Sequence, residues 1–124
     1  MLNSRHATWP RGFSLLELLT TLAVATILIA VAIPTYQSAV QKAKVAAATQ
    51  DIMTIATAIG RYNTLNNGPP PDLATIGFDN QLDPWGHPYV YKFPGQHSDF
   101  DLLSLGGDGQ EGGEGNASDI VNWK

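Results

Sequence analysis

The residues best suited to chemistry lie near the end of the chain, between Gly106 and Asp119. This segment holds six glycines and four acidic residues. Carboxylates and free backbone carbonyls supply the oxygen ligands that Ca²⁺ prefers, about six to eight at a site. An EF-hand loop counted from Asp108 fits poorly, because Gln110 and Gly112 stand at its third and fifth positions. From the residues alone, a solvated acidic loop is favoured and a calcium site stays open.

Histidine and cysteine chemistry is sparse. The chain has three histidines and no cysteine, so neither a disulfide nor a thiol nucleophile is possible. His87 and His97 lack a second ligand pair at metal spacing, and we expect both to be exposed turn residues rather than zinc ligands. His6 lies close to the N-terminus. No phosphate-binding glycine loop and no Gly-x-Ser-x-Gly elbow occurs, and we predict that the chain is not an enzyme.

A single acidic residue, Glu17, stands inside the apolar run Phe13–Ile33. These 21 residues correspond to roughly 31 Å of helix, about the thickness of a bilayer's hydrocarbon core. The residues before the run include Arg5 and Arg11 and no acid, as in a membrane-targeting signal. A carboxylate in lipid costs about 2.5–3.5 kcal/mol, so it usually has a partner. We predict a membrane helix in which Glu17 is functional rather than an incidental charge.

The helix is predicted to continue through Thr35–Asn66, which is rich in alanine and other helix formers. Its apolar residues recur at helical spacing: Val45, Ile52, Ile55 and Ile59, extended loosely by Tyr36, Val40 and Met53. Pro34 is expected to bend the helix without necessarily ending it. Asn and Gly near residues 66–68 are expected to stop it. The second half of the helix would present one apolar face to a small sheet.

Two short strands are predicted after an extended proline-containing connector, Gly68–Leu82. Aromatic residues alternate over Tyr89–Phe93, and apolar residues follow over Phe100–Leu105. The loop Gly95–Ser98 would join them as an antiparallel hairpin. Asp83–Gly86 has the residues of a β-turn. The predicted fold class is therefore α+β, with one long N-terminal helix packed on a small antiparallel sheet.

The junction RGFSLLE, residues 11–17, resembles the prepilin cleavage signal of type IV pilins and type II secretion pseudopilins. The resemblance implies that a prepilin peptidase cuts after Gly12, that Phe13 is methylated and that the apolar helix is retained. Glu17 would be the fifth mature residue, the usual acidic position of the family, and would pair with the Phe13 amine of a neighbouring subunit during assembly. Loss of Arg5 and Arg11 with the leader changes the net charge from −4 to −6, which argues against a nucleic-acid partner.

The segments DPWGHPYVY, DFDLLSLGGDGQEGGEG and SDIVNW look like the C-terminal region of the major pseudopilins of type II secretion systems. In that family the last loop binds calcium through a backbone carbonyl and acidic side chains. The resemblance implies a calcium site at the Leu105 carbonyl, Asp108 and Asp119, with Ser118 where the family often has another acid or alanine. Calcium would then stabilise a domain that has no disulfide.

The chain divides into four predicted parts. Residues 1–12 form the leader, 13–34 the hydrophobic transmembrane and assembly helix, 35–66 its amphipathic continuation, and 67–124 a periplasmic loop and sheet region with the C-terminal calcium loop. The resemblance implies a single-pass protein of the bacterial inner membrane with its C-terminal domain in the periplasm. Copies would polymerise, with minor pseudopilins and an inner-membrane assembly platform, into a filament that helps drive folded exoproteins across the outer membrane.

Two alternative functions remain. A major pilin of a type IV pilus, used in adhesion, twitching or DNA uptake, shares the leader, but the missing cysteines and the Gly/Asp-rich ending argue against it. A membrane-anchored periplasmic binding module would use the acidic loop to capture a ligand. In that case Phe13 would never become a free or methylated terminus.

Overall fold

The computed structural model describes residue 1 and residues 8–124, so the predictions for Arg5 and His6 lie outside the described residues. The described chain forms two compact units, Met1–Gln37 and Ser38–Lys124. The helix α1 spans Leu15–Asn66 and contains Pro34. In the first unit its apolar side chains are almost all exposed, and α1 is long and apolar enough to cross a membrane. The predicted helix is confirmed, with its start at Leu15 rather than Phe13.

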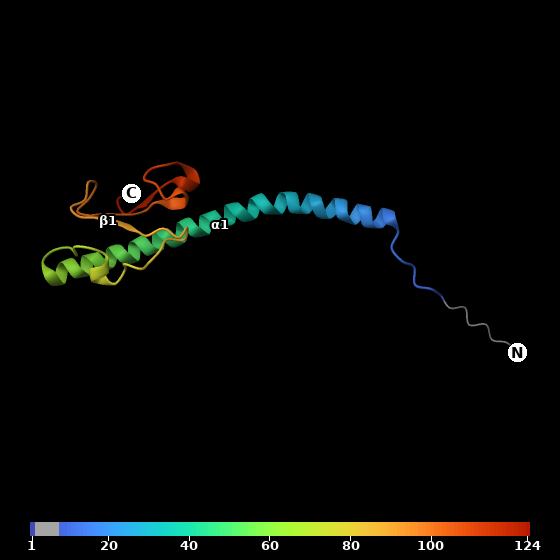
Figure 1. Ribbon diagram of the computed structural model, residues 1–124, viewed down its shortest axis with the longest axis horizontal. Coiled ribbons are helices and arrows are strands. Elements are labelled where there is room, and N and C mark those ends of the chain that lie inside the picture. Colours follow the sequence, from blue (N-terminus) through green and yellow to red (C-terminus); the bar gives the residue numbers. More distant parts are fainter. Residues whose placement is uncertain (2–7) are drawn as a thin grey trace. The chain divides into compact units, whose positions relative to one another are not determined.

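The second unit contains a three-stranded antiparallel sheet in the order β1-β2-β3. Its strands are β1 (Val90–Lys92), β2 (Asp101–Ser104) and β3 (Ile120–Val121). Val90 pairs with Leu103, which pairs in turn with Val121. The orange and red strands lie beside the green part of α1 (Figure 1). The predicted hairpin is confirmed, whereas β3 was not predicted because two residues carry no measurable alternation.

Three short 3₁₀ turns complete the second unit. They are η1 (Ala74–Ile76), η2 (Gly106–Asp108) and η3 (Gly115–Ala117). The helix α1 ends as expected, because the next residue, Asn67, has a φ of 54° in the left-handed region.

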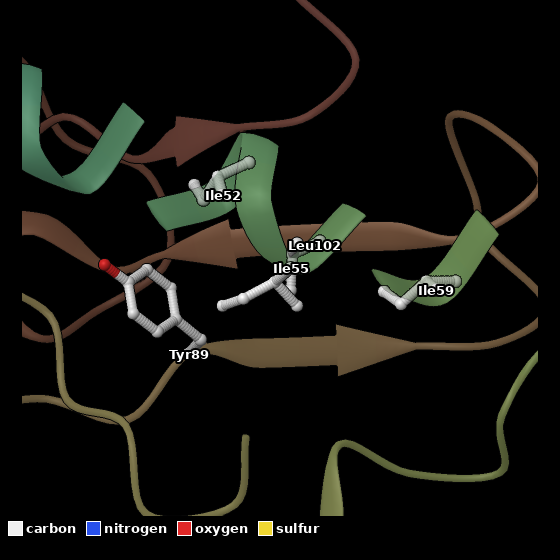
Figure 2. Packing of buried hydrophobic residues seen from close by; sticks show 5 residues of the cluster. All are labelled: Ile52, Ile55, Ile59, Tyr89 and Leu102. Atoms are coloured by element: carbon white, nitrogen blue, oxygen red, sulfur yellow. The ribbon is translucent and has the colours of Figure 1, made fainter. Parts of the chain in front are cut away.

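Apolar residues of α1 pack against β2 and the residue before β1. Ile52, Ile55 and Ile59 point toward Leu102 and Tyr89 (Figure 2), and all five are at most 6% exposed. Full burial of such side chains stabilises the fold by about 1.5–3 kcal/mol each. The Tyr89 hydroxyl also donates to Asp51 Oδ2 of α1 over 2.7 Å. Burial and this hydrogen bond raise the pKa of Tyr89 far above its ordinary range, so the donor stays protonated.

The predicted apolar stripe of α1 is wrong at its edges. Val45 is 39% exposed, and Tyr36 and Met53 are more exposed still, whereas Ala48 is buried. Met53 follows Ile52 directly, and one residue of helix turns a side chain by about 100° away from the packed face. Val40 is half-buried, as predicted, and Ala48 is the first fully buried residue of α1.

All four residues of β2 are buried, including the polar residues Asp101 and Ser104 at its two ends. Buried polar groups are tolerated when they are hydrogen-bonded. The two ends of β2 therefore depend on side-chain hydrogen bonds with the adjoining loops.

Candidate assembly and calcium sites

Glu17 and Ser14 bond reciprocally at the start of α1. The Ser14 backbone N–H donates to Glu17 Oε2 over 3.0 Å, and the Glu17 backbone N–H donates to Ser14 Oγ over 3.2 Å. This is a capping box, which satisfies two N–H groups that the first helical turn leaves without intrahelical partners. The carboxylate predicted for assembly thus already has a partner in its own chain. The spacing Ser-x-x-Glu is a capping signal that the sequence itself carries.

The predicted cleavage residues lie just before this capping box. Gly12 and Phe13 precede α1, and Phe13 is 84% exposed. A peptide bond in non-helical, exposed backbone is open to an enzyme, in contrast to one inside a helix.

Asp101 organises the hairpin loop, residues 95–98, at one end of β2. Its carboxylate accepts hydrogen bonds from the backbone N–H groups of Gln96, His97 and Ser98 and from His97 Nδ1 at 2.9–3.3 Å. Burial raises the pKa of Asp101, but these hydrogen bonds outweigh it and lower the pKa to about 2. The ring of His97 also stacks on Trp123 with centroids 4.2 Å apart. The carboxylate therefore closes the loop without any outside ligand.

Asp83 organises the other end of β2 and was not singled out from the sequence. Its side chain is fully buried. Oδ1 accepts from the backbone N–H groups of Trp85 and His87 at 3.1 and 2.8 Å, and Oδ2 accepts from Ser104 Oγ at 2.6 Å. The Gly86 N–H donates to the Asp83 carbonyl over 2.9 Å, as expected of the predicted β-turn. The turn was predictable, but its bond to Ser104 depends on the tertiary fold.

The glycine loop, defined here as Leu105–Asp119, carries all four predicted calcium ligands. Leu105 precedes η2, Asp108 ends it, and Ser118 follows η3 directly before Asp119. The two turns η2 and η3 pack together, since a Cβ on Gly106 would lie 2.7 Å from the Ser118 carbonyl oxygen. The fold thus places the start of the glycine loop, at Leu105, close to its end, at Asp119.

Asp119 has an incomplete set of hydrogen bonds. Its Oδ2 accepts from the Gly112 N–H over 2.8 Å, whereas Oδ1 is buried and has no hydrogen-bond partner. Asp108 Oδ1 accepts from the Gln110 N–H over 3.1 Å. A buried carboxylate oxygen without a donor is costly, and it fits a bound cation. The predicted donor set consists wholly of oxygens, which suits Ca²⁺.

The histidine predictions are partly wrong. His97 is exposed, as expected, but His87 is half-buried, and its Nδ1 lies 3.1 Å from the Gly106 carbonyl oxygen. The ring packs against the glycine loop because glycines leave room for it. Within residue 1 and residues 8–124, no three His, Cys, Asp or Glu side chains form a group that could hold a metal. The predicted calcium ligands contain only two carboxylates, so that finding does not test them.

Comparisons with known proteins cover both ends of the chain. Residues 75–123 match the family model described as type II secretion system (T2SS), protein G, and residues 10–33 match the prokaryotic N-terminal methylation motif. The chain is 37% identical to type II secretion system core protein G of Pseudomonas aeruginosa, over 90% of this chain and 94% of that protein. The chain belongs to the type II secretion system core protein G family. This membership confirms the predicted resemblance.

Other members agree with this result. Core protein G of Vibrio cholerae is 33% identical, over 90% of each chain. The crystal structure of the major pseudopilin from the type 2 secretion system of enterohaemorrhagic Escherichia coli superposes with a TM-score of 0.58 at 27% identity. It covers 70% of this chain and 92% of that chain. The α+β pseudopilin fold is confirmed, and so is the prediction of a structural subunit rather than an enzyme. The same membership favours the pseudopilin over the two alternative functions.

Proposed function

We propose that the mature chain begins at Phe13 and polymerises into a periplasmic pseudopilus that helps drive folded exoproteins across the outer membrane. In this proposal a prepilin peptidase removes residues 1–12 and the Phe13 amine is methylated. The helix of residues 13–34 anchors the subunit once in the inner membrane and leaves the C-terminal unit in the periplasm. Minor pseudopilins and the inner-membrane assembly platform are the expected partners. The observation that carries the proposal is the methylation-motif match across residues 10–33, joined to an apolar helix with exposed side chains.

Glu17 is the proposed assembly residue. As a membrane-embedded carboxylate it is costly unless it has a partner. The capping hydrogen bond that its carboxylate accepts comes from the backbone N–H of Ser14, which carries no charge. The charge of Glu17 therefore remains uncompensated within the subunit. The new amine of Phe13 in a neighbouring copy carries the opposite charge and would compensate it.

Mass spectrometry of the protein purified from membranes tests the processing step. The expected mass is that of residues 13–124 plus one methyl group. Recovery of the chain with its first twelve residues still attached would refute the proposal, because a retained leader leaves no free Phe13 amine.

Glu17→Gln tests the charge of the assembly residue. The amide oxygen of glutamine can still accept from the Ser14 N–H, so the variant keeps the capping box and loses only the charge. We expect normal cleavage and membrane insertion, but loss of filaments and of exoprotein secretion. Thr20→Ala is the matched control, since it removes a neighbouring hydroxyl that donates to the Leu16 carbonyl. Wild-type filament yield in Glu17→Gln would disprove charge pairing.

We further propose that the glycine loop binds one Ca²⁺ through the Leu105 carbonyl, Asp108, Ser118 and Asp119. Support comes from the unpartnered Oδ1 of Asp119 and from the packing of η2 on η3. The bound ion would neutralise carboxylates and hold together a segment whose glycines are costly to order. Isothermal titration of the calcium-free mature protein in detergent should give one site, and Asp119→Asn should abolish it. Equal heats for wild type and variant would contradict the proposed site.

A further inference from the structure

The imidazole of His87 lies directly against η2, the first turn of the glycine loop. Its Nδ1 is 3.1 Å from the Gly106 carbonyl oxygen. A Cβ added to Gly109 would lie 2.9 Å from His87 Nε2, so the other ring nitrogen abuts the residue that follows η2. The ring therefore contacts the turn at both of its ends.

Glycine is required at these contacts. Gly106 and Gly109 have φ values of 65° and 68°, in the left-handed region. Any side chain at Gly109 would also collide with the His87 ring. Close approach of the ring to the backbone is thus built into the turn by the two glycines.

The Gly106 peptide groups are held on both sides. The Gly106 N–H donates to Ser104 Oγ over 3.3 Å, and that hydroxyl donates to the buried Asp83. A carbonyl oxygen can only accept, so His87 Nδ1 is the donor in the second contact. The His87 backbone N–H is fixed by Asp83 in turn. His87 therefore links the Asp83 turn, through its backbone, to the glycine loop, through its ring.

We propose that His87 is a positioning residue of the calcium site. By its hydrogen bond to Gly106 it fixes η2, which directly follows Leu105 and ends at Asp108. This inference rests on the calcium site proposed above. Groups that orient metal ligands typically change metal affinity about 10–100-fold when removed. A purely structural role of His87 would instead lower stability and leave calcium affinity intact.

The test compares three variants of the full mature chain in detergent, each titrated calorimetrically with CaCl₂. In His87→Leu, which fills the space but cannot donate, we expect calcium affinity to fall at least about tenfold. In His87→Asn, an amide N–H replaces Nδ1–H, and we expect affinity within about threefold of wild type. His97→Ala is the matched control because that ring contacts Asp101 and Trp123 instead, and its affinity should be unchanged.

Three results would overturn the inference. If His87→Leu binds calcium with wild-type affinity, His87 has no positioning role. If His87→Leu and His87→Asn weaken calcium binding equally, the hydrogen bond to Gly106 is not the cause. If the wild type itself binds no calcium, the calcium proposal fails and the role of His87 toward the ion fails with it. In that case amide hydrogen exchange in EDTA tests separately whether His87 holds η2 in the absence of calcium. Faster exchange at Gly106–Gly109 in His87→Leu would show that the ring holds η2 even without an ion.

Discussion

Two loops of the C-terminal unit are each organised around one aspartate, and they differ in how that aspartate is satisfied. The carboxylate of Asp101 accepts four hydrogen bonds from the hairpin loop. The carboxylate of Asp119 accepts one, from Gly112, and leaves Oδ1 buried and unpartnered. The hairpin loop is closed by its own N–H groups, whereas the glycine loop lacks donors for its buried oxygen. A cation is the simplest substitute for those donors.

Removal of the proposed Ca²⁺ gives the largest expected effect, and it acts on only one of the two loops. At a free Ca²⁺ concentration of about 100 times Kd, binding stabilises the folded state by about 2.7 kcal/mol. For a domain of 60–100 residues, about 4–8 °C per kcal/mol gives a decrease in Tm of roughly 10–20 °C on chelation. Thermal unfolding followed by tryptophan fluorescence, with CaCl₂ or EDTA, measures it.

Variants of the two aspartates provide the controls for chelation. Asp119→Asn should unfold at the same temperature with CaCl₂ as with EDTA. Asp101→Asn should be less stable in both buffers and keep most of the calcium-dependent difference, because loss of a nearby negative charge weakens Ca²⁺ binding only slightly. A calcium-dependent difference that survives in Asp119→Asn would mean that the two loops do not differ as described.

Asn122 gives the next largest effect. Its Oδ1 accepts from the buried Leu102 N–H over 2.8 Å, and its Nδ2 donates to the Phe100 carbonyl over 3.1 Å. Asn122→Ala leaves the Leu102 N–H without an acceptor, at a cost of about 1–3 kcal/mol in the free energy of unfolding. Because neither hydrogen bond involves calcium, urea titrations should show the same loss in the free energy of unfolding with CaCl₂ and with EDTA. Asn116→Ala, at an exposed residue of the glycine loop, should show none.

The pH dependence of stability should also distinguish the two loops, by a smaller change in Tm. The folded pKa of Asp101 is about 2, below the unfolded value of 3.8, so folding favours the ionised form. Its contribution is complete above about pH 3.8 and is lost as the pH falls through 2. In EDTA, the wild type should lose Tm over this range, and Asp101→Asn should lose several degrees less. Parallel curves for the two proteins would show that the hydrogen bonds of Asp101 do not favour its charged form.

The sequence was most informative where the signal was periodic or local. The apolar run, the isoleucines of α1 and the hairpin each depend on spacing within a few residues, and each was predicted. Asn122 and β3 could not be predicted, because their partners lie about twenty residues away in β2. No local pattern encodes a pairing at that distance.

The candidate calcium site shows the same limit. The abundance of oxygen ligands was evident from the composition of residues 106–119, but the burial of Asp119 Oδ1 depends on how the loop closes. His87 was predicted to be an exposed turn residue for the same reason. Its ring contacts glycines that are 19 and 22 positions later in the chain, and such contacts arise only from the tertiary fold.

Lys92 should have the smallest effect, and it tests whether the loops are electrostatically coupled. Its ammonium bonds Glu111 Oε1 at 2.5 Å, which raises the pKa of Lys92 and keeps it charged. Lys92, Asp101 and Asp119 line one cavity of about 190 Å³. A nearby positive charge opposes binding of Ca²⁺, so Lys92→Met should increase calcium affinity by less than about threefold in low salt.

Both side chains of the ion pair are well exposed, so the increase should disappear in 1 M NaCl, where the Debye length is about 3 Å. Lys124→Met is the matched control, and a salt-independent increase in Lys92→Met would mean that Lys92 acts on the site by packing rather than by charge.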